Sequence, residues 1–274
     1  MCGRFILVQK LEAIQKRFNA TASFDIPLKP SYNIAPGSYT PVITSANPRQ
    51  IDLLRFGMVP SWSASDEMII NARSEGDHNS ADDPGYRGAK GIIEKPSFRK
   101  PIRSQRCLVI ADAFIEGTTR EKLSKPFLVY LRNKVRPFAM AGIYDIWKNP
   151  ATGVEIHAFA IITTVANELM LKIPHHRSPV ILLQHQESKW LNPGTPLTDI
   201  TAMLRPYHAD LMNAYPISAA IKSPTANSPD LINPLGPTLV EEVGFESKNY
   251  ILKTGMGNPK THFSQHGETE ELKP

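Results

Sequence analysis

Short runs of β-branched and aromatic residues, separated by turn signals, make up much of the 274-residue chain. Runs of this composition are typical of β-strands. The clearest are "TPVITS", "IDLLRFGMV", "RCLVIAD", "PFLVYL", "PFAMAGIYDIW" and "IHAFAIITT". Turn signals such as Asn149-Pro150 and Thr152-Gly153 separate neighbouring runs. The pattern predicts a chain built mainly of short strands.

A few segments carry helical spacing instead. In "LVQKLEAIQKRF" the residues Leu11, Ile14 and Phe18 recur with polar residues between them, which predicts a short amphipathic surface helix. Helical patterns return in "ANELMLK" and "LTDITAMLRPY". Many strands with few helices predict an α+β fold, in which a curled, barrel-like and mainly antiparallel sheet has a few flanking helices.

The length favours one domain with insertions. We expect a single domain over residues 1–252. Residues 76–91 are polar, rich in glycine and acidic residues and without a period, which predicts a surface loop or an insertion. Residues 253–274 have little to bury and predict a loosely held tail.

Composition narrows the class of protein. Hydrophobic residues make up 41% and charged residues 21% of the chain, which is ordinary globular usage. No apolar run approaches the roughly 18 residues of a spanning helix, and the N-terminus lacks a signal-peptide pattern, so we expect a soluble cytoplasmic protein. The formal charge of +5 suits a polyanionic partner without requiring one.

The chain has two cysteines, Cys2 and Cys107, which cannot build a disulfide framework or a four-cysteine zinc site. No CxxC or HExxH segment occurs, so we expect no metal and no cofactor. The two thiols therefore need separate explanations.

Cys2 follows the initiator methionine in "MCGRF". Removal of Met1 would leave a 1,2-aminothiol, whose amine and thiol have ordinary pKa values of roughly 7.7–8.0 and 8.5. Such a group can condense with an aldehyde to a thiazolidine. It can also attack an amide, with the terminal amine as base, as N-terminal nucleophiles do. The alternative is a small buried cysteine with a packing role.

Several polar clusters could assist Cys2. If residues 68–75 are extended, Asn71, Arg73 and Glu75 point to one face, which predicts an anion or sugar site or else a solvated strand face. In "RCLVIADAFIEG" the carboxylates Asp112 and Glu116 follow a buried-looking strand. Partial burial there would raise their pKa values toward neutrality and suit them to acid/base chemistry, although ordinary strand-end charges are the alternative.

Two further segments are candidates. In "IPHHRSPVIL" the adjacent His175 and His176 should face opposite ways in an extended chain, so at most one should enter a shared site. In "FGMVPSW" an exposed Trp62 could stack on a nucleic-acid base, or it could pack in the core.

Taken together, these segments form an ordered series that resembles the SRAP family, the SOS-response-associated peptidases also called abasic-site processing proteins. The series runs from Met1 to about Leu183 and comprises "MCGRF", "YNIAPG", "FGMVPSW", "INARSE", "KPSFRKPIRSQRCLVIADAFIE", "FAMAGIYDIW", "AIITTVAN" and "HHRSPVIL". The resemblance implies an α+β fold around a barrel-like sheet. It also implies binding of single-stranded DNA and a covalent crosslink to abasic sites, whose ring-opened deoxyribose presents an aldehyde.

Roles for individual residues follow from their places in these motifs. The resemblance implies that Cys2 is the nucleophile after Met1 is removed, a step the family is thought to carry out itself. Asn71 would hold the sugar or the terminal amine, Glu116 would shuttle protons, and His175 would aid ring opening. The residues implied to contact DNA are Arg4, Pro36, Trp62, Arg73, Thr163, Thr164 and Arg177. We expect a monomer without membrane partners, associated with the nucleoid when bound to DNA.

Two departures from the family pattern bear on DNA binding. Ile115-Glu116-Gly117 stands where the family usually has Tyr-Glu-Trp, so an aromatic platform is missing. The loop 76–91 looks inserted, and its Asp82-Asp83 pair would repel phosphates if it lay in the DNA groove.

Two alternative functions follow from the same residues. Cysteine and glycine after the methionine also begin the class II glutamine amidotransferases and other N-terminal-nucleophile hydrolases, but no partner motif such as "HRG" is present. A non-catalytic DNA-binding module is the other alternative, and the missing aromatic at Gly117 favours it.

Overall fold

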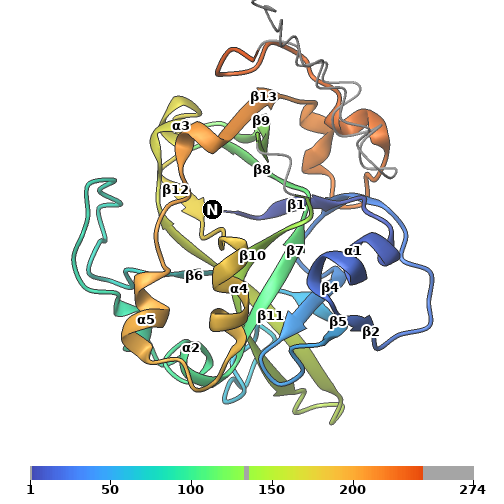
Figure 1. Ribbon diagram of the computed structural model, residues 1–274, viewed down its shortest axis with the longest axis vertical. Helices are drawn as coiled ribbons and strands as arrows, with labels where there is room; N and C mark the ends of the chain where they lie inside the picture. The colour runs from blue at the N-terminus through green and yellow to red at the C-terminus, as the bar shows by residue number, and fades with distance from the viewer. Residues whose placement is uncertain (1, 133–135, 243–274) are drawn as a thin grey trace, which may run out of the picture.

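The computed structural model describes residues 2–132 and 136–242, so the tail predicted over residues 253–274 lies outside the described residues. Five of the strands close a barrel in which β11 pairs with β10, β10 with β7, β7 with β4, β4 with β5, and β5 again with β11. All of these pairings are antiparallel except that of β5 with β11. The five are β4 (Tyr39–Thr44), β5 (Gln50–Phe56), β7 (Arg106–Ala111), β10 (Phe138–Lys148) and β11 (Glu155–Val165) (Figure 1).

Three short strands extend this sheet: β2 (Thr21–Ala22), β6 (Asn71–Arg73) and β12 (Arg177–Pro179). Both β6 and β12 pair with the C-terminal half of β11, β6 in parallel and β12 antiparallel. The C-terminal end of β11 therefore brings together two polar segments that are about a hundred residues apart in sequence.

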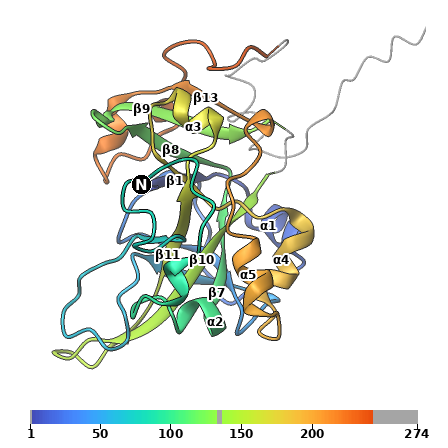
Figure 2. The ribbon, with the colours of Figure 1, turned by 90° about the vertical axis from the view of Figure 1, so that its left-hand side faces the viewer.

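A second, antiparallel sheet lies across the end of the barrel, in the order β13-β9-β8-β1-β3 (Figure 2). Its strands are β1 (Arg4–Leu7), β3 (Ser31–Ile34), β8 (Ala113–Thr118), β9 (Lys122–Leu131) and β13 (Met212–Pro216). The predicted α+β fold with a curled, barrel-like sheet is confirmed.

The helices are short and flank the sheets (Figures 1 and 2). They are α1 (Leu11–Phe18), α2 (Pro101–Ser104), α3 (Glu168–Lys172), α4 (Gln184–Leu191) and α5 (Leu197–Ala202), with 3₁₀ turns η1 (Gly91–Ile93), η2 (Ala209–Leu211), η3 (Ala219–Lys222) and η4 (Pro229–Ile232). The predicted helices α1, α3 and α5 are present. The pattern did not predict α4, which is mostly polar and is held by Trp190, whose indole N–H donates to the Cys107 carbonyl at 3.0 Å. Within the described residues no helix is long and apolar enough to cross a membrane.

The core joins the two sheets through aromatic side chains. Phe5 of β1 meets Phe56 of the barrel edge to face, with ring centroids 5.5 Å apart, and Phe56 stacks on Phe159 at 5.3 Å. All three rings are fully buried. Because such pairs favour one geometry, they fix the start of the chain, three residues after Cys2, against the barrel.

Asp112 marks the point where the chain passes from β7 of the barrel to β8 of the second sheet. Its buried carboxylate accepts hydrogen bonds from the backbone N–H groups of Val8 at 2.7 Å and Gln9 at 3.1 Å, directly after β1. Burial raises the pKa of Asp112 to about 6. Asp112 therefore anchors β1, the strand that follows Cys2, rather than facing an open site.

We expect Asp112→Asn to change the pH dependence of stability. The raised pKa means that the folded chain binds the Asp112 proton more tightly than the unfolded chain does. The stability contributed by protonated Asp112 is therefore full below the ordinary pKa of 3.8 and is lost as pH rises through about 6. An asparagine cannot ionise. One pKa unit corresponds to about 1.4 kcal/mol, and each kcal/mol to roughly 2–4 °C. The variant's melting temperature, relative to wild type, should rise by several degrees between pH 4 and pH 7. Equal pH profiles would show that Asp112 titrates normally, and Asp83→Asn, at an exposed carboxylate, gives the baseline.

Candidate active site

Cys2 lies at the junction of the two sheets and is completely buried. Strand β1 pairs with β8 so that Arg4 is opposite Ile115. Continuing this antiparallel register by one residue places Gly3 opposite Glu116, which brings Cys2 beside the Glu116 strand. Burial, and then the negative charge of Glu116, raise the pKa of the Cys2 thiol well above its ordinary value. The thiol is therefore neutral at rest and needs a neighbouring base before it can act as a nucleophile.

Asn71 ties the barrel to the start of the chain. Its Nδ2 donates to the carbonyl of Cys2 at 3.0 Å and to that of Ile70 at 2.9 Å. Its Oδ1 is buried and accepts no hydrogen bond from any residue that the structure describes. A buried acceptor without a donor is costly, so the amide offers a binding position for an N–H or O–H group next to Cys2.

Glu116 and His175 form a buried pair beside Cys2. His175 Nε2 lies 3.4 Å from Glu116 Oε2, and both side chains are at most 6% exposed. Burial raises the pKa of Glu116 to about 7 and lowers that of His175 to about 3. Near neutral pH the imidazole is therefore uncharged, and Glu116 exchanges its proton readily. A carboxyl group with a pKa near 7 can serve as both a general acid and a general base.

The two histidines do not face opposite ways, and that prediction was wrong. Their rings stack, with centroids 5.1 Å apart and planes at 26°. The reason is that β12 begins only at Arg177, so the alternation of a strand does not apply to the residues before it. His175 faces Glu116, whereas His176 Nε2 lies 3.4 Å from Asp82.

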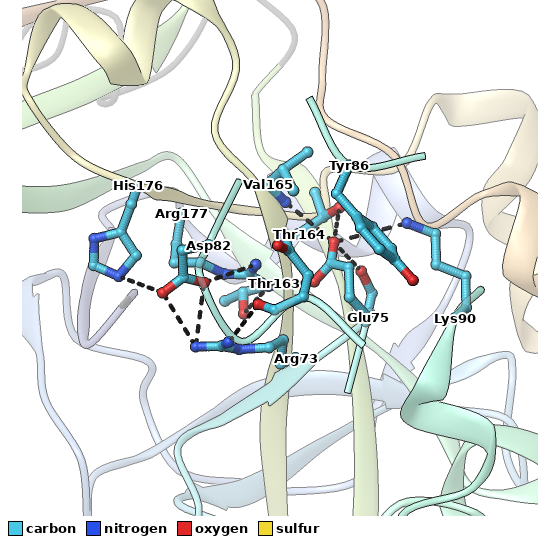
Figure 3. A network of polar contacts seen from close by, with 12 residues as sticks. Arg73, Glu75, Asp82, Tyr86, Lys90, Thr163, Thr164, Val165, His176 and Arg177 are labelled. Atoms are coloured by element: carbon cyan, nitrogen blue, oxygen red, sulfur yellow. Dashed lines mark hydrogen bonds and ion pairs between the residues drawn. The ribbon is translucent and has the colours of Figure 1, made fainter. Parts of the chain in front are cut away.

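Arg177 is the centre of a buried polar network (Figure 3). Its Nη2 donates to Glu75 Oε2 at 2.8 Å and to Thr163 Oγ1 at 3.2 Å. Thr164 Oγ1 donates to the other oxygen of Glu75 at 2.9 Å, and Lys90 Nζ lies 3.7 Å from that oxygen. Burial alone would raise the pKa of Glu75, but the charge and hydrogen bond of Arg177, together with hydrogen bonds from the Glu75 backbone and Ser74, hold the pKa below its ordinary value. Glu75 is thus a permanent anionic partner for Arg177.

The extended segment predicted over residues 68–75 ends early. Strand β6 covers only Asn71–Arg73, and Glu75 lies in the following turn with no exposed surface. Asn71 and Arg73 do share a face, and a cavity of about 220 Å³ opens there, between β6 and β12. It is lined by Asn71, Arg73, Gly76, Asp77, Lys95, Phe98, Thr163 and Arg177.

The other residues predicted to contact DNA lie outside this network. Trp62 is 67% exposed on the loop after β5. That loop is held in place, because Trp147 Nε1 donates to the Ser63 carbonyl at 2.8 Å. Pro36 is half-buried in the turn between β3 and β4. Arg4 Nη2 lies 3.4 Å from the Lys222 carbonyl at η3.

Gly117 cannot carry a side chain in this fold. A Cβ atom added there would lie 1.8 Å from the carbonyl oxygen of Lys122, in the β8–β9 hairpin. The backbone of the hairpin therefore crowds position 117 itself, and this conformation leaves no room for the aromatic side chain that the family usually has there.

Among the described residues, no group of three or more His, Cys, Asp and Glu side chains is placed to hold a metal ion. The site is instead a buried thiol at the start of the chain with a carboxyl, an imidazole and an amide around it. These features define a barrel-based α+β protein with a candidate site around its second residue.

Comparison with known proteins gives the family. The family described as SOS response associated peptidase (SRAP) matches residues 1–224, and the chain belongs to it. The abasic site processing protein YoqW of Bacillus subtilis is 39% identical over 240 residues, which cover 85% of this chain and 99% of YoqW. The abasic site processing protein HMCES of Gallus gallus is 29% identical over 78% of this chain and 69% of its own. A crystal structure of a Bacteroides thetaiotaomicron protein superposes with a TM-score of 0.71 at 31% identity, covering 85% of this chain and 99% of that one.

Proposed function

We propose that this protein processes abasic sites in DNA by binding single-stranded DNA and forming a covalent thiazolidine between mature Cys2 and the ring-opened abasic sugar. The observation that carries the proposal is the placement of Cys2. It is buried, hydrogen-bonded through its carbonyl to Asn71, and electrostatically coupled to Glu116, which has a pKa near neutrality. Relatives named as abasic site processing proteins support the substrate.

The first step is hydrolysis of the bond between Met1 and Cys2. Water adds to the Met1 carbonyl carbon, the peptide bond breaks, and the nitrogen of Cys2 takes a proton and becomes the terminal amine. Glu116 accepts the proton of the attacking water and returns it to the leaving nitrogen, a role for which a pKa of about 7 is suited. Asn71 holds the Cys2 end of the bond through the Cys2 carbonyl.

The second step is condensation with the aldehyde. The Cys2 amine adds to the aldehyde carbon, and one water leaves to give an imine. The Cys2 sulfur then adds to the imine carbon while the thiol proton moves to nitrogen, which closes a five-membered ring without an oxidant or reductant. Protonated Glu116 assists the departure of water, and His175 exchanges protons with the sugar during ring opening.

The DNA strand follows the side of the site that carries β6 and β12. Arg4, Arg73 and Arg177 contact phosphates on either side of the abasic sugar, and Trp62 and Pro36 contact bases. Thr163 and Thr164 act through the Arg177–Glu75 pair, to which both are hydrogen-bonded. We expect a monomer that works in the cytoplasm and is associated with the nucleoid when bound to DNA.

The test is a comparison of two oligonucleotides on a denaturing gel. One carries a single abasic site, and the other carries a tetrahydrofuran analogue that lacks the aldehyde. We expect a denaturation-resistant product with the first only, and an intact mass equal to protein without Met1 plus DNA minus one water. No product, or equal products from both oligonucleotides, would refute the proposal. Cys2-dependent hydrolysis of glutamine would instead support the amidotransferase alternative.

A further inference from the structure

The loop 76–91 is a closed, ordered excursion between β6 and η1 (Figure 1). Its two ends touch: a Cβ atom on Gly76, where φ is +58°, would lie 2.8 Å from the carbonyl carbon of Gly91. In the middle of the loop Asn79 Nδ2 donates to the Asp83 carbonyl at 3.0 Å, and the Asp83 N–H donates to Asn79 Oδ1 at 2.9 Å. These contacts hold the intervening residues, Asp82 among them, in a defined turn.

Asp82 lies against the cationic face of the site (Figure 3). Its Oδ1 is 3.2 Å from Arg73 Nη2 and 3.4 Å from Arg177 Nη1, and its Oδ2 is 3.4 Å from His176 Nε2. A carboxylate held by two guanidinium groups beside an imidazole nitrogen presents oxygens where a phosphate would present its own. The negative charge that the sequence predicted to repel DNA therefore lies directly on the residues expected to bind it.

Arg177 has two acidic partners that differ in permanence. Glu75 is fully buried and also accepts a hydrogen bond from Thr164. Moving it away would deprive the buried Arg177 guanidinium of its buried anionic partner, which is costly. Asp82 belongs to a surface loop, and its side chain is 19% exposed. A DNA phosphate and Asp82 cannot share the two guanidinium groups, because like charges a few ångströms apart repel strongly in a partly buried site. Asp82 is therefore the exchangeable partner.

We propose that Asp82 occupies a phosphate-binding position formed by Arg73, His176 and Arg177, and that a backbone phosphate of single-stranded DNA displaces it when the strand binds. The proposal rests on the proposed function, and it adds His176 as a phosphate contact and the loop 76–91 as an internal competitor. Competition of this kind reduces the affinity for every strand, because the apparent association constant is the intrinsic constant multiplied by the fraction of protein in which the position is open. It thereby restricts capture to strands held by further contacts.

The test measures reversible binding separately from crosslinking. Cys2→Ala protein and a fluorescent, undamaged single-stranded oligonucleotide give the dissociation constant by anisotropy at fixed salt. In that background we expect Asp82→Asn to tighten binding about tenfold. Asp83→Asn is the matched control, because it changes the net charge equally. The Asp83 side chain accepts a hydrogen bond from the Gly85 N–H and is not paired with Arg73 or Arg177. It should change binding by less than about twofold. Asp82→Ala should tighten binding as Asp82→Asn does.

Each other result has a definite meaning. Equal tightening by Asp82→Asn and Asp83→Asn would show a general charge effect and overturn the proposal. Weaker binding by Asp82→Asn and Asp82→Ala, with unchanged melting temperatures, would show that Asp82 supports the geometry of the arginines instead. If Cys2 protein crosslinks abasic DNA but Asp82 variants bind as the parent does, the proposed function stands and this inference fails. If protein that retains Cys2 does not crosslink abasic DNA but Asp82→Asn tightens reversible binding, the inference about Asp82 stands and the proposed function fails.

Discussion

Cys2→Ala should abolish the crosslink to abasic single-stranded DNA, with a loss of at least about a hundredfold in rate. An alanine amine can still form an imine, but it has no sulfur to close the ring. The imine hydrolyses on denaturation unless borohydride reduces it first. We therefore expect no stable band from Cys2→Ala on a denaturing gel, and a band that appears only when borohydride is present during the reaction. Equal crosslinking by the variant without borohydride would refute the role of the thiol.

The second cysteine provides a matched control. Cys107 is as fully buried as Cys2, and burial likewise raises the pKa of its thiol. It lies on β7, where its sulfur packs near Gly142, and it has no place in the proposed chemistry. Cys107→Ala should crosslink at the wild-type rate once allowance is made for any loss of folded protein, measured by thermal unfolding. Loss of crosslinking in correctly folded Cys107→Ala would point to a different nucleophile.

The fold class could be predicted from the sequence because the strands carry strong local patterns. The short β-rich runs correspond to β4, β5, β7, β9, β10 and β11. What local patterns could not predict is the closure of the barrel. It depends on two residue pairs, Arg55 with Ala158 and Phe56 with Phe159, that join segments a hundred residues apart. Nor could they predict α4, whose helix depends on the tertiary anchor Trp190.

The candidate site shows the same division. Cys2, Asn71 and Glu116 could be named from motifs, and the structure brings Asn71 and Glu116 to the start of the chain. The acidic partners of Arg177 could not be predicted, because they lie in a turn and a loop whose position in space no local sequence pattern determines. One signal did exist. An arginine at the start of an apolar run such as "HHRSPVIL" must be paired if it is buried, which calls for an acidic partner elsewhere. The sequence could not show that there would be two, Glu75 and Asp82.

The role of Glu116 can be tested only when removal of Met1 is separated from crosslinking, because a retained Met1 would block the Cys2 amine by itself. Two preparations of Glu116→Gln achieve this. In one the chain is expressed with its own Met1, and its intact mass is measured. In the other a cleavable leader is removed by a protease that leaves Cys2 first, and the crosslinking rate is measured against wild type prepared in the same way.

We expect the first preparation of Glu116→Gln to retain Met1 and the second to crosslink about 10²- to 10⁴-fold more slowly, the range for loss of a general acid or base. The pH profile is the sharper measure. Glu116 has a raised pKa of about 7, so the protonated form that expels water from the addition product is present below pH 7 and is lost above it. The wild-type rate, corrected for ionisation of the Cys2 amine, should therefore fall between pH 7 and pH 9. Glutamine does not titrate, so the variant should lack this fall. Complete loss of Met1 together with an unchanged rate and an unchanged profile would show that burial of Glu116 is structural, and would leave the proton transfers to His175 or to water.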